Sequence, residues 1–371
     1  MSCQYRCGEH LCQPPGPFDA AAKKCYHVAR GRPETLSPSS SEDTLNDNVR
    51  VAIIGCGGIA RSHAKAYAAS GDICQLVASA DTSVTAADAF GKEFGCAVYH
   101  DVTQMLDEVR PQAVSICTPP SSHLPLVRLC AQRGIAVLCE KPLARNLAEA
   151  DEMVDIVEQS GILFMHGLCH RFHGPVSQMM ELVRNGSLGK VIHYYNRFSF
   201  RFEGVENRWF SDPEIAGGGI LLDTAVHSLD LFSYIVGSVA EISAHVSTTL
   251  PIKVEDSAAI LVVSESGVSG DISCSWVTTP GESIVRLYCT GGIAELDYNG
   301  KPNLCYCLGE NEAVVPVLFE GPDRFAAEIR HFVECVRSNS RPAISVYDGR
   351  EAIRLIEEAY ASAEVPRPGV S

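Results

Sequence analysis

A glycine-rich turn near residue 55 limits this chain to a small set of folds. Val51 to Ile54 form a short, apolar, β-branched run typical of a buried strand, and Gly55-Cys56-Gly57-Gly58-Ile59-Ala60 follows it. The spacing fits G-x-G-x-x-G/A, in which the glycines allow a tight turn and a close approach to a pyrophosphate, and the small last residue allows close helix–strand packing. A helix from Arg61 to Ser70 then presents its free N–H groups to the phosphates. Small residues also suit other strand-to-helix turns, so the assignment depends on its context.

The next predicted strand supplies that context, because it ends at an acidic residue. Gln75 to Ala80 form a second apolar run, and Asp81 follows where an acidic residue would bind the adenosine ribose 2′-hydroxyl. We predict NAD as the cofactor, with NADP less favoured, because Asp81 would repel a 2′-phosphate and no arginine follows it closely. The predicted cofactor contacts are Gly55, Gly57, Gly58, Ile59, Ala60, Asp81, Thr118, Pro119, His123, Glu140 and Lys141.

Strands and helices alternate from residue 50 to residue 170. Helices are expected at 84–94, 102–109, 123–133 and 147–159, and strands at 98–99, 113–117, 136–139 and 163–165. This alternation predicts an α/β domain with a doubly wound parallel sheet of the Rossmann type. After the strand at 113–117, Thr118-Pro119-Pro120 breaks the chain at the carboxyl edge of the sheet, where such sheets bind ligands.

The pattern changes near residue 171. Strand-like runs cover 191–202, 239–250, 257–264, 270–276, 283–289 and 293–298, and helices are expected at 175–185, 220–236, 324–338 and 349–363. We predict a second, α+β domain over residues 171–345, with a large, mostly antiparallel open sheet that has one face exposed or covered by a partner. The C-terminal helix and tail, 346–371, are expected to pack back on the first domain.

Residues 1–49 have the composition of a flexible N-terminal extension. Pro14, Pro15, Pro17 and the polar run 37–43 favour a segment without a core of its own. The spacing of Cys3, Cys7 and Cys12 does not match a standard zinc-finger pair, so we predict no metal site.

The overall composition disfavours several classes of protein. The net charge of −15 and the absence of a basic stripe disfavour a nucleic-acid partner. We find no apolar run of about 18 residues and no signal sequence, and therefore expect no membrane partner. Many of the 16 cysteines lie inside apolar segments, where they are typical of small core residues: Cys74, Cys117, Cys139, Cys274 and Cys289. This usage favours free thiols in a cytoplasmic protein.

Glu140-Lys141-Pro142 is the first candidate catalytic element. It follows the predicted strand at 136–139, so Lys141 is expected at the edge of the sheet where the cofactor binds. An ammonium group there would hydrogen-bond a substrate hydroxyl and stabilise the alkoxide that forms as hydride leaves. A single lysine after a strand is more often an ordinary surface residue.

The second candidate element is a helix that begins with three glycines, Gly217-Gly218-Gly219. Asp223 and His227 are spaced i, i+4 on this helix and so share a face, with Asp230 on roughly the same side. A carboxylate beside an imidazole fixes its tautomer and raises its basicity, which suits a general base. The alternative is a polar stripe on an otherwise apolar helix.

Three further residues are weaker candidates. Arg171, after the strand at 163–165, is a candidate for binding a polyol or phosphate substrate. Trp209 is expected on a loop that lines the substrate cavity. We interpret His63 as a structural partner of nearby backbone rather than a catalyst.

The ordered set of motifs resembles the family of glucose-fructose oxidoreductase, inositol dehydrogenase and rhizopine catabolism proteins (Gfo/Idh/MocA). The likeness covers about residues 50–363 and rests on the glycine turn, Glu140-Lys141-Pro142 and the triple-glycine helix with Asp223 and His227. It implies NAD(P)-dependent transfer of a hydride between nicotinamide and a secondary alcohol of a sugar or cyclitol. It also implies a catalytic set of Lys141, Asp223 and His227, with Arg171 and Trp209 added by our reasoning for substrate binding.

Two other readings stay open. An NAD-dependent glycoside hydrolase or a nucleotide-sugar dehydrogenase of the same family would carry the same motifs. A cofactor-binding regulator without catalysis would not need Lys141, Asp223 and His227, and their presence disfavours it. The resemblance also implies a homodimer or homotetramer, because a broad sheet face must be covered.

Overall fold

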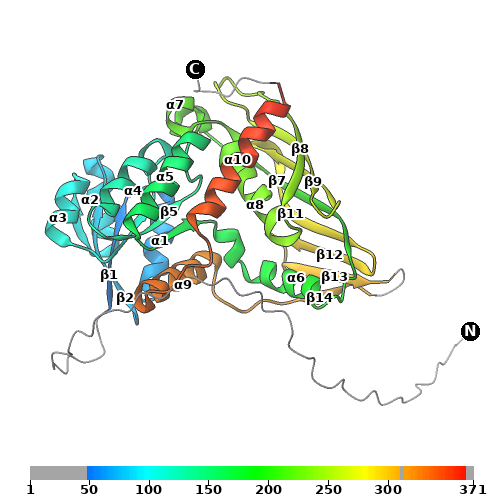
Figure 1. Cartoon of the computed structure of the whole chain (residues 1–371), viewed down its shortest axis with the longest axis horizontal. Coiled ribbons are helices and arrows are strands. Elements are labelled where there is room, and N and C mark those ends of the chain that lie inside the picture. Colours follow the sequence, from blue (N-terminus) through cyan, green and yellow to red (C-terminus); the bar gives the residue numbers. More distant parts are fainter. Residues whose placement is uncertain (1–47, 310–312, 365–371) are drawn as a thin grey trace, which may run out of the picture. The chain divides into compact units, whose positions relative to one another are not determined.

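The computed structural model describes residues 48–309 and 313–364, and its first layer is a parallel sheet flanked by helices (Figure 1). Six strands have the order β3-β2-β1-β4-β5-β6, and every neighbouring pair is parallel. The strands are β1 Val49–Ile54, β2 Cys74–Ala80, β3 Ala97–Tyr99, β4 Ala113–Ile116, β5 Ala136–Glu140 and β6 Phe164–Gly167. The chain order reverses between β1 and β4, so their carboxyl ends form the crevice in which such sheets bind ligands. The predicted doubly wound sheet is confirmed.

Five α-helices connect these strands, and three of them begin at a side-chain N-cap. They are α1 Gly58–Ala69, α2 Val84–Phe94, α3 Val102–Val109, α4 His123–Ala131 and α5 Leu147–Ser160. The side chains of Ser83, Asp101 and Asn146 accept a hydrogen bond from a backbone N–H in the first turn of α2, α3 and α5. Helix α1 has no such cap and begins at Gly58, earlier than the predicted Arg61, because the glycine turn leads directly into its first turn.

The second layer is an eight-stranded sheet in the order β14-β13-β12-β11-β7-β10-β9-β8. Its strands are β7 Val191–Arg201, β8 Val239–Ser247, β9 Ser257–Ser264, β10 Ser269–Ser275, β11 Val277–Cys289, β12 Gly292–Asp297, β13 Leu304–Leu308 and β14 Val315–Val317. All pairs are antiparallel except β10 with β7. The predicted mostly antiparallel sheet is confirmed, and β13 and β14 extend it beyond the predicted strands.

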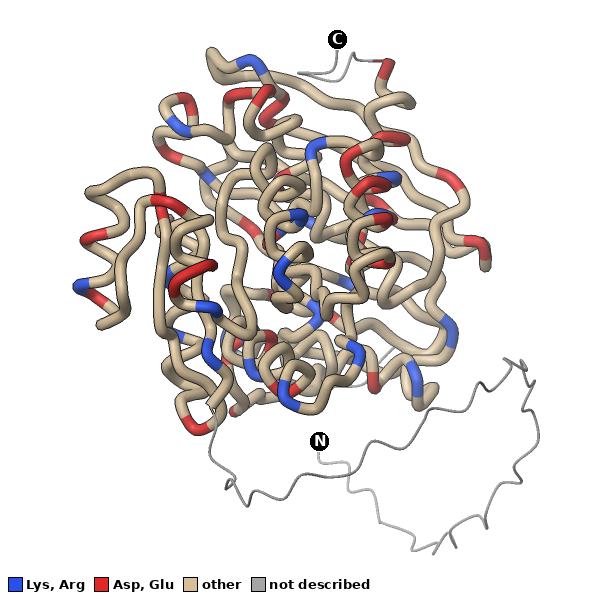
Figure 2. The backbone as a smooth tube through the Cα atoms, turned by 60° about the vertical axis from the view of Figure 1, so that its left-hand side comes forward, with Lys and Arg blue, Asp and Glu red and all other residues tan. Residues whose placement is uncertain are grey.

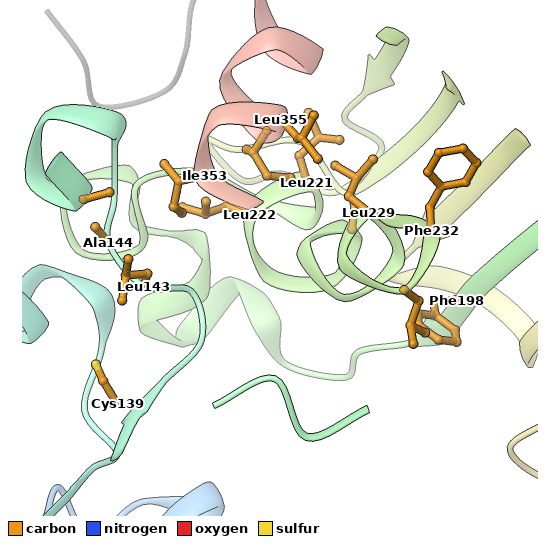
Figure 3. Packing of buried hydrophobic residues seen from close by; sticks show 14 of the residues in the cluster. Cys139, Leu143, Ala144, Phe198, Leu221, Leu222, Leu229, Phe232, Ile353 and Leu355 are labelled. Carbon is orange, nitrogen blue, oxygen red and sulfur yellow. The ribbon is translucent and has the colours of Figure 1, made fainter. Parts of the chain in front are cut away.

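One face of this sheet packs on helices. Helix α8, Val226–Ile235, lies on β7, and α6, Gly174–Arg184, lies on β12. The close-up in Figure 3 shows Leu229 and Phe232 of α8 beside Phe198 of β7, and Leu221 and Leu222 beside Ile353 and Leu355 of α10. These side chains are buried and form one continuous apolar core.

The last two helices both contact the first domain, which was expected only for residues 346–371. Helix α9, Arg324–Ser338, lies within residues 171–345, but it packs on α1 and β1 of the first sheet. Helix α10, Val346–Ser362, runs between α5 of the first domain and α8 and β8 of the second (Figure 1). Both helices are amphipathic. The apolar face of α9 packs into the core around β1 and α1, and the apolar face of α10 packs into the core shared with the second sheet. The expectation for residues 1–49 concerns a segment that lies almost wholly outside the described residues. Residues 365–371 also lie outside them.

One helical stretch corrects the expectation that no apolar run is long enough to span a membrane. Pro213–Ile235 has the length and composition of a span, and 89% of its window is buried inside the fold, which is the behaviour of a core helix. Figure 2 shows Lys and Arg interspersed with Asp and Glu along the described chain. Cys74, Cys117, Cys139 and Cys274 are buried free thiols, as predicted, whereas Cys289 is only partly buried.

The three glycines before α8 permit the closest backbone contacts in this part of the fold. Gly217 has a φ of +82°, and a Cβ there would lie 2.8 Å from the Cα of Arg145. A Cβ at Gly219 would lie 2.0 Å from the carbonyl oxygen of Glu255. Because both obstacles are backbone atoms, a larger residue at either position must displace the chain.

We predict that Gly219→Ala lowers the free energy of unfolding by about 1–3 kcal/mol, as expected for overpacking against a fixed backbone. Thermal unfolding without cofactor measures the effect. The matched control is Gly58→Ala, because a Cβ at Gly58 would meet no atom within 4 Å. Equal melting temperatures for the two variants would contradict the prediction.

Candidate active site

The glycine turn has the shape that a dinucleotide pyrophosphate requires. Gly55 has a φ of +90°, and a Cβ there would lie 2.8 Å from the carbonyl oxygen of Cys117, so only glycine fits. A Cβ at Gly57 or Gly58 would meet no atom within 4 Å, so the backbone of the turn faces open space. No acidic residue or side-chain cap occupies the first turn of α1. The free N–H groups of this helix end therefore fit a phosphate.

Asp81 is bound to the same turn. Its Oδ2 accepts a hydrogen bond from the backbone N–H of Cys56 at 2.7 Å, and its Oδ1 accepts one from the N–H of Ser83 at 2.7 Å. These bonds hold the end of β2 beside the end of β1. Each carboxylate oxygen has a further lone pair, so the predicted bond to a ribose hydroxyl is compatible with this geometry and stays a prediction.

A cavity of about 330 Å³ lies where the two sheets meet. The carboxyl end of β5 supplies Lys141, the segment before α8 supplies Asp223, and α8 itself supplies His227. The remaining lining residues come from the second sheet and the neighbouring loops and helices: His170, Phe198, Phe200, Thr224, Ser283, Tyr298, Asn299 and Arg324. The predicted catalytic set thus shares one cavity.

Lys141 and Asp223 form an ion pair across this cavity. The Lys141 Nζ donates to the Asp223 carboxylate Oδ1 at 2.7 Å and to its backbone oxygen at 2.8 Å. Burial by itself would lower the pKa of Lys141, but the charge and hydrogen bond of Asp223 overcome it and leave the pKa raised. Lys141 is therefore an ammonium group, and two of its three N–H donors are used, which leaves one for a substrate oxygen.

Asp223 lies in a π-helical turn, Leu221–Ala225, rather than in the regular helix that the sequence predicts. A buried carboxylate, Glu255, fixes the start of this turn. Its Oε1 accepts hydrogen bonds from the N–H groups of Gly219 and Leu221, both at 3.0 Å, and from the Tyr360 hydroxyl at 2.6 Å. Helix ends leave N–H groups without partners, and Glu255 satisfies two of them. This anchor sets the position of the residues that follow.

The i, i+4 pair predicted for Asp223 and His227 is wrong in its details. Asp223 bonds to Lys141 and, through Oδ2, accepts from the Thr224 hydroxyl at 3.2 Å. His227 instead packs against the ring of His170, with the centroids 4.3 Å apart, and its buried Nδ1 has no hydrogen-bond partner in the described part of the chain. Asp223 and His227 still line the same cavity, but no hydrogen bond joins them among the described residues.

The two histidines of the cavity are neutral. Burial, together with the nearby cations, lowers the pKa of His227 well below its ordinary value of 6.5, and the same is true of His170. The Nδ1 of His170 lies 2.8 Å from the hydroxyl of Tyr298. A neutral imidazole is able to accept a proton, and in His227 the nitrogen available for this is Nε2, because Nδ1 is buried.

Arg171 does not line the cavity, contrary to its predicted role in substrate binding. Its guanidinium donates to Asp230, at 2.5 to 3.1 Å, and to Asp348 at 2.9 Å, and lies over the ring of Tyr234. These bonds link η2, Cys169–Phe172, to α8 and α10. The planar fork is fully used by internal carboxylates, so Arg171 holds helices together. Asp230 is committed to the same ion pair.

Trp209 also lies outside the lining of the cavity. It is part of a short 3-10 turn, Trp209–Ser211, and stacks on Phe210 with the ring centroids 3.8 Å apart. The structure therefore does not bring the predicted loop residue to the substrate cavity.

His123 and Glu140, two predicted cofactor contacts, have hydrogen-bond partners inside the protein. His123 is fully buried, and its ring nitrogens lie 2.9 Å from the carbonyl oxygen of Thr118 and 3.0 Å from that of Pro142. It therefore connects the loops after β4 and β5. The carboxylate of Glu140 lies 2.8 Å from the Nε2 of His63 and accepts from the N–H of Lys141 at 3.1 Å. Both side chains shape the loop that carries Lys141. Thr118 and Pro119 remain partly exposed at the edge of the sheet.

His63 is structural, but its partners are side chains rather than the predicted backbone. Its other nitrogen, Nδ1, lies 3.1 Å from the hydroxyl of Ser115. Ligand atoms of His63, Glu140 and Glu328 lie within 4.8 Å of one another, and both carboxyl oxygens of Glu328 are buried with no partner among the described residues. These residue types also bind metal ions, so the absence of a metal site stays a prediction.

Sequence reasoning did not select His170, Tyr298 or Arg324. His170 directly precedes Arg171 after a predicted strand, so its position at the edge of the sheet was an available signal. Tyr298 directly follows β12, and Arg324 is the first residue of α9. No local sequence pattern marks either of them as a cavity residue. Their contribution depends on packing between elements more than 100 residues apart, such as the 2.8 Å contact of His170 with Tyr298.

Comparison with known proteins agrees with this geometry. Residues 49–168 match the oxidoreductase family with an NAD-binding Rossmann fold, GFO_IDH_MocA, and residues 176–295 match the C-terminal domain of the same family. The chain belongs to this family. It is therefore an NAD-dependent oxidoreductase in class, as the sequence predicted.

The chain is similar along most of its length to characterised dehydrogenases. It is 28% identical over 346 residues to D-apiose dehydrogenase from Paraburkholderia graminis, covering 88% of this chain and 91% of that protein. It is 36% identical over 203 residues to D-glucoside 3-dehydrogenase from Escherichia coli, covering 53% and 57%. Levoglucosan dehydrogenase in complex with NADH and levoglucosan superimposes with a TM-score of 0.80 at 21% identity, covering 85% of this chain and 97% of that one. This last likeness shows a shared fold.

We predict that Glu328 makes the folded protein less stable as the pH rises. Burial and the charge of Glu140 raise the pKa of Glu328 well above its ordinary value of 4.5, so it is protonated when folded and ionised when unfolded. Between those two pKa values the unfolded state is increasingly favoured. Glu328→Gln removes this penalty, so its melting temperature relative to the parent should increase from about pH 5 to about pH 8.

The control is Glu334→Gln, which changes an exposed carboxylate on the same helix and should keep a constant difference from the parent. A pH-independent difference for Glu328→Gln would mean that Glu328 is ionised in the folded protein.

Proposed function

We propose that this protein transfers a hydride between NAD and a secondary alcohol of a sugar or cyclitol, with Lys141 and His227 as its catalytic residues. The observation that carries the proposal is the Lys141–Asp223 ion pair, which shares one cavity with the neutral His227 at the carboxyl edge of the parallel sheet. Dehydrogenases of sugars and of inositols among the relatives support this substrate class. The glycoside hydrolase and regulator readings have no comparable support.

The residues have complementary tasks in alcohol oxidation. His227 accepts the proton of the substrate hydroxyl on Nε2, because its Nδ1 is buried out of reach of a substrate. The ammonium group of Lys141 donates its remaining hydrogen bond to the same oxygen and stabilises the developing alkoxide, while Asp223 holds Lys141 in place and protonated. The aromatic wall of Phe198 and Tyr298 excludes water from one side of the cavity. Bound NAD supplies the acceptor for the hydride.

The turn after β1 would bind the cofactor. The backbone of Gly55, Gly57 and Gly58 leaves room for the pyrophosphate, and α1 directs its N-terminal end toward it. Asp81 at the end of β2 favours NAD over NADP, since its carboxylate would face a 2′-phosphate with like charge.

We predict that Lys141→Met and His227→Ala each reduce kcat by about a hundredfold or more, because each removes a group that acts on the reacting oxygen. The measurement is the appearance of NADH absorbance with NAD and a panel of hexoses, pentoses and cyclitols. His245→Ala is the control, since His245 is exposed on β8 away from the cavity. Full activity in either of the first two variants would refute these roles.

We also propose that the protein is a cytoplasmic homo-oligomer that pairs through the outer face of its second sheet. Apolar and aromatic side chains occur there among polar ones. Leu261 of β9 is 62% exposed and Ile293 of β12 is 42% exposed. Leu261 pairs in register with Asp271, which pairs with Tyr195 in turn, so these residues form a row across the sheet. A flat face of this size favours a partner sheet.

We predict that Leu261→Arg lowers the molar mass measured by light scattering from a dimer or tetramer to a smaller species, because a buried arginine at the interface would lack a partner. Val84→Arg is the matched control, because Val84 is 54% exposed but lies on α2. A monomeric parent, or a variant with the mass of the parent, would contradict the prediction.

A further inference from the structure

We infer that Arg324 binds an anionic group of the substrate, a carboxylate or a phosphate, in the cavity that holds Lys141, Asp223 and His227. The inference rests on the proposed function and narrows its substrate class to acidic sugars, either sugar acids or sugar phosphates. Arg324 is the first residue of α9, and it lines this cavity from a helix that otherwise packs on the parallel sheet.

The first argument is the charge balance of the cavity. Its ionised lining residues are Lys141, Arg324 and Asp223, and the carboxylate of Asp223 is already bonded to Lys141. The two lining histidines are neutral, as argued above. The cavity therefore carries one positive charge that no lining carboxylate balances, and a neutral sugar would leave it so.

The second argument is the lack of an anionic partner for Arg324. Its Nε is buried and has no hydrogen-bond partner within residues 48–309 and 313–364. Its neighbours in that part of the chain are the ring of Phe325, 5.1 Å from the guanidinium carbon, the thiol of Cys169, and the carboxyl of Glu328 one turn along α9, whose pKa burial raises well above its ordinary value, so that it is protonated. A partly desolvated guanidinium without a carboxylate is costly unless a ligand supplies one.

The contrast with Arg171 makes this point sharper. Arg171 is about as deeply placed, and two carboxylates, Asp230 and Asp348, satisfy its planar fork. Internal arginines of this protein are thus paired when their role is structural. Arg324 instead lines a cavity, and a guanidinium matches a carboxylate or phosphate in a bidentate geometry.

The third argument comes from a second cavity of about 500 Å³ between α1 and the start of α9, which Arg324 also lines. Its other charged lining residues are Lys65 and Asp323, and the carboxylate of Asp323 accepts bonds from the N–H groups of Phe325 and Ala326. Arg324 therefore lies where the two cavities approach each other, and the second cavity has room for a charged substituent beside a further cation. The glycine turn lines neither cavity, which favours the substrate over the cofactor as the anion.

The experiment compares matched neutral and anionic sugars with the full-length protein and NAD: D-glucose, D-glucuronate and D-glucose 6-phosphate, and D-galactose with D-galacturonate. We expect the parent to favour an anionic member by about tenfold or more in kcat/KM, the effect of a charge-assisted bidentate bond. Arg324→Gln should raise KM for that substrate by a similar factor, leave kcat less affected and change the neutral sugar little. Arg324→Lys should restore part of the preference. The relative loss for uronate and phosphate identifies which anion is bound.

Lys92→Gln is the matched control, since Lys92 is exposed on α2, lines neither cavity and should leave the preference intact. Equal use of neutral and anionic sugars by the parent, with the same ratio in Arg324→Gln, would overturn the inference while the proposed function stands. A rise in KM for NAD with every sugar would overturn it in favour of a cofactor contact.

If no sugar is oxidised, calorimetric titration of the same anions into the protein with NADH decides the matter independently of turnover. Binding that Arg324→Gln abolishes would support the anion site even though the proposed function had failed. No binding of any anion to the parent would overturn the inference.

Discussion

The ion pair between Lys141 and Asp223 is the interaction on which the site depends. Lys141 follows the last residue of β5 in the parallel sheet, and Asp223 comes from the turn before α8, which packs on the antiparallel sheet. Each partner is about one-fifth exposed, so removing one would leave a partly desolvated charge on the other. The pair therefore sets the relative position of the two layers at the cavity and at the same time keeps Lys141 protonated.

The surrounding structure makes this pair usable for chemistry. Glu255 and Tyr360 fix the start of the π-helical turn, and Glu140 and His123 fix the loop that carries Lys141. Each of these groups is buried, so their hydrogen bonds are not exchanged with water and hold the reacting groups at constant geometry. Burial also explains why His227 is neutral while Lys141 is charged, although the two face the same cavity: only Lys141 has a carboxylate partner.

The residues that carry out the reaction differ from the residue that we expect to select the substrate. Proton and hydride transfer from an alcohol require Lys141, Asp223 and His227, and all are compatible with a neutral sugar. Arg324 adds a cation that this chemistry does not use and that no carboxylate lining the cavity balances. The relatives act on several different sugars, as their names state, so a residue of this kind is where substrates are expected to be distinguished.

The sequence by itself determined the two sheets, their order along the chain, the glycine turn and the three catalytic candidates, because these depend on short periodic patterns and on local turn chemistry. Only the tertiary structure decided what each polar side chain bonds to. Arg171, Trp209, His123 and Glu140 were chosen for position along the chain, and the structure gives each of them partners inside the protein. His170, Tyr298 and Arg324 enter the cavity through contacts between distant segments. Such pairings follow from the packing of whole elements, which no local pattern encodes.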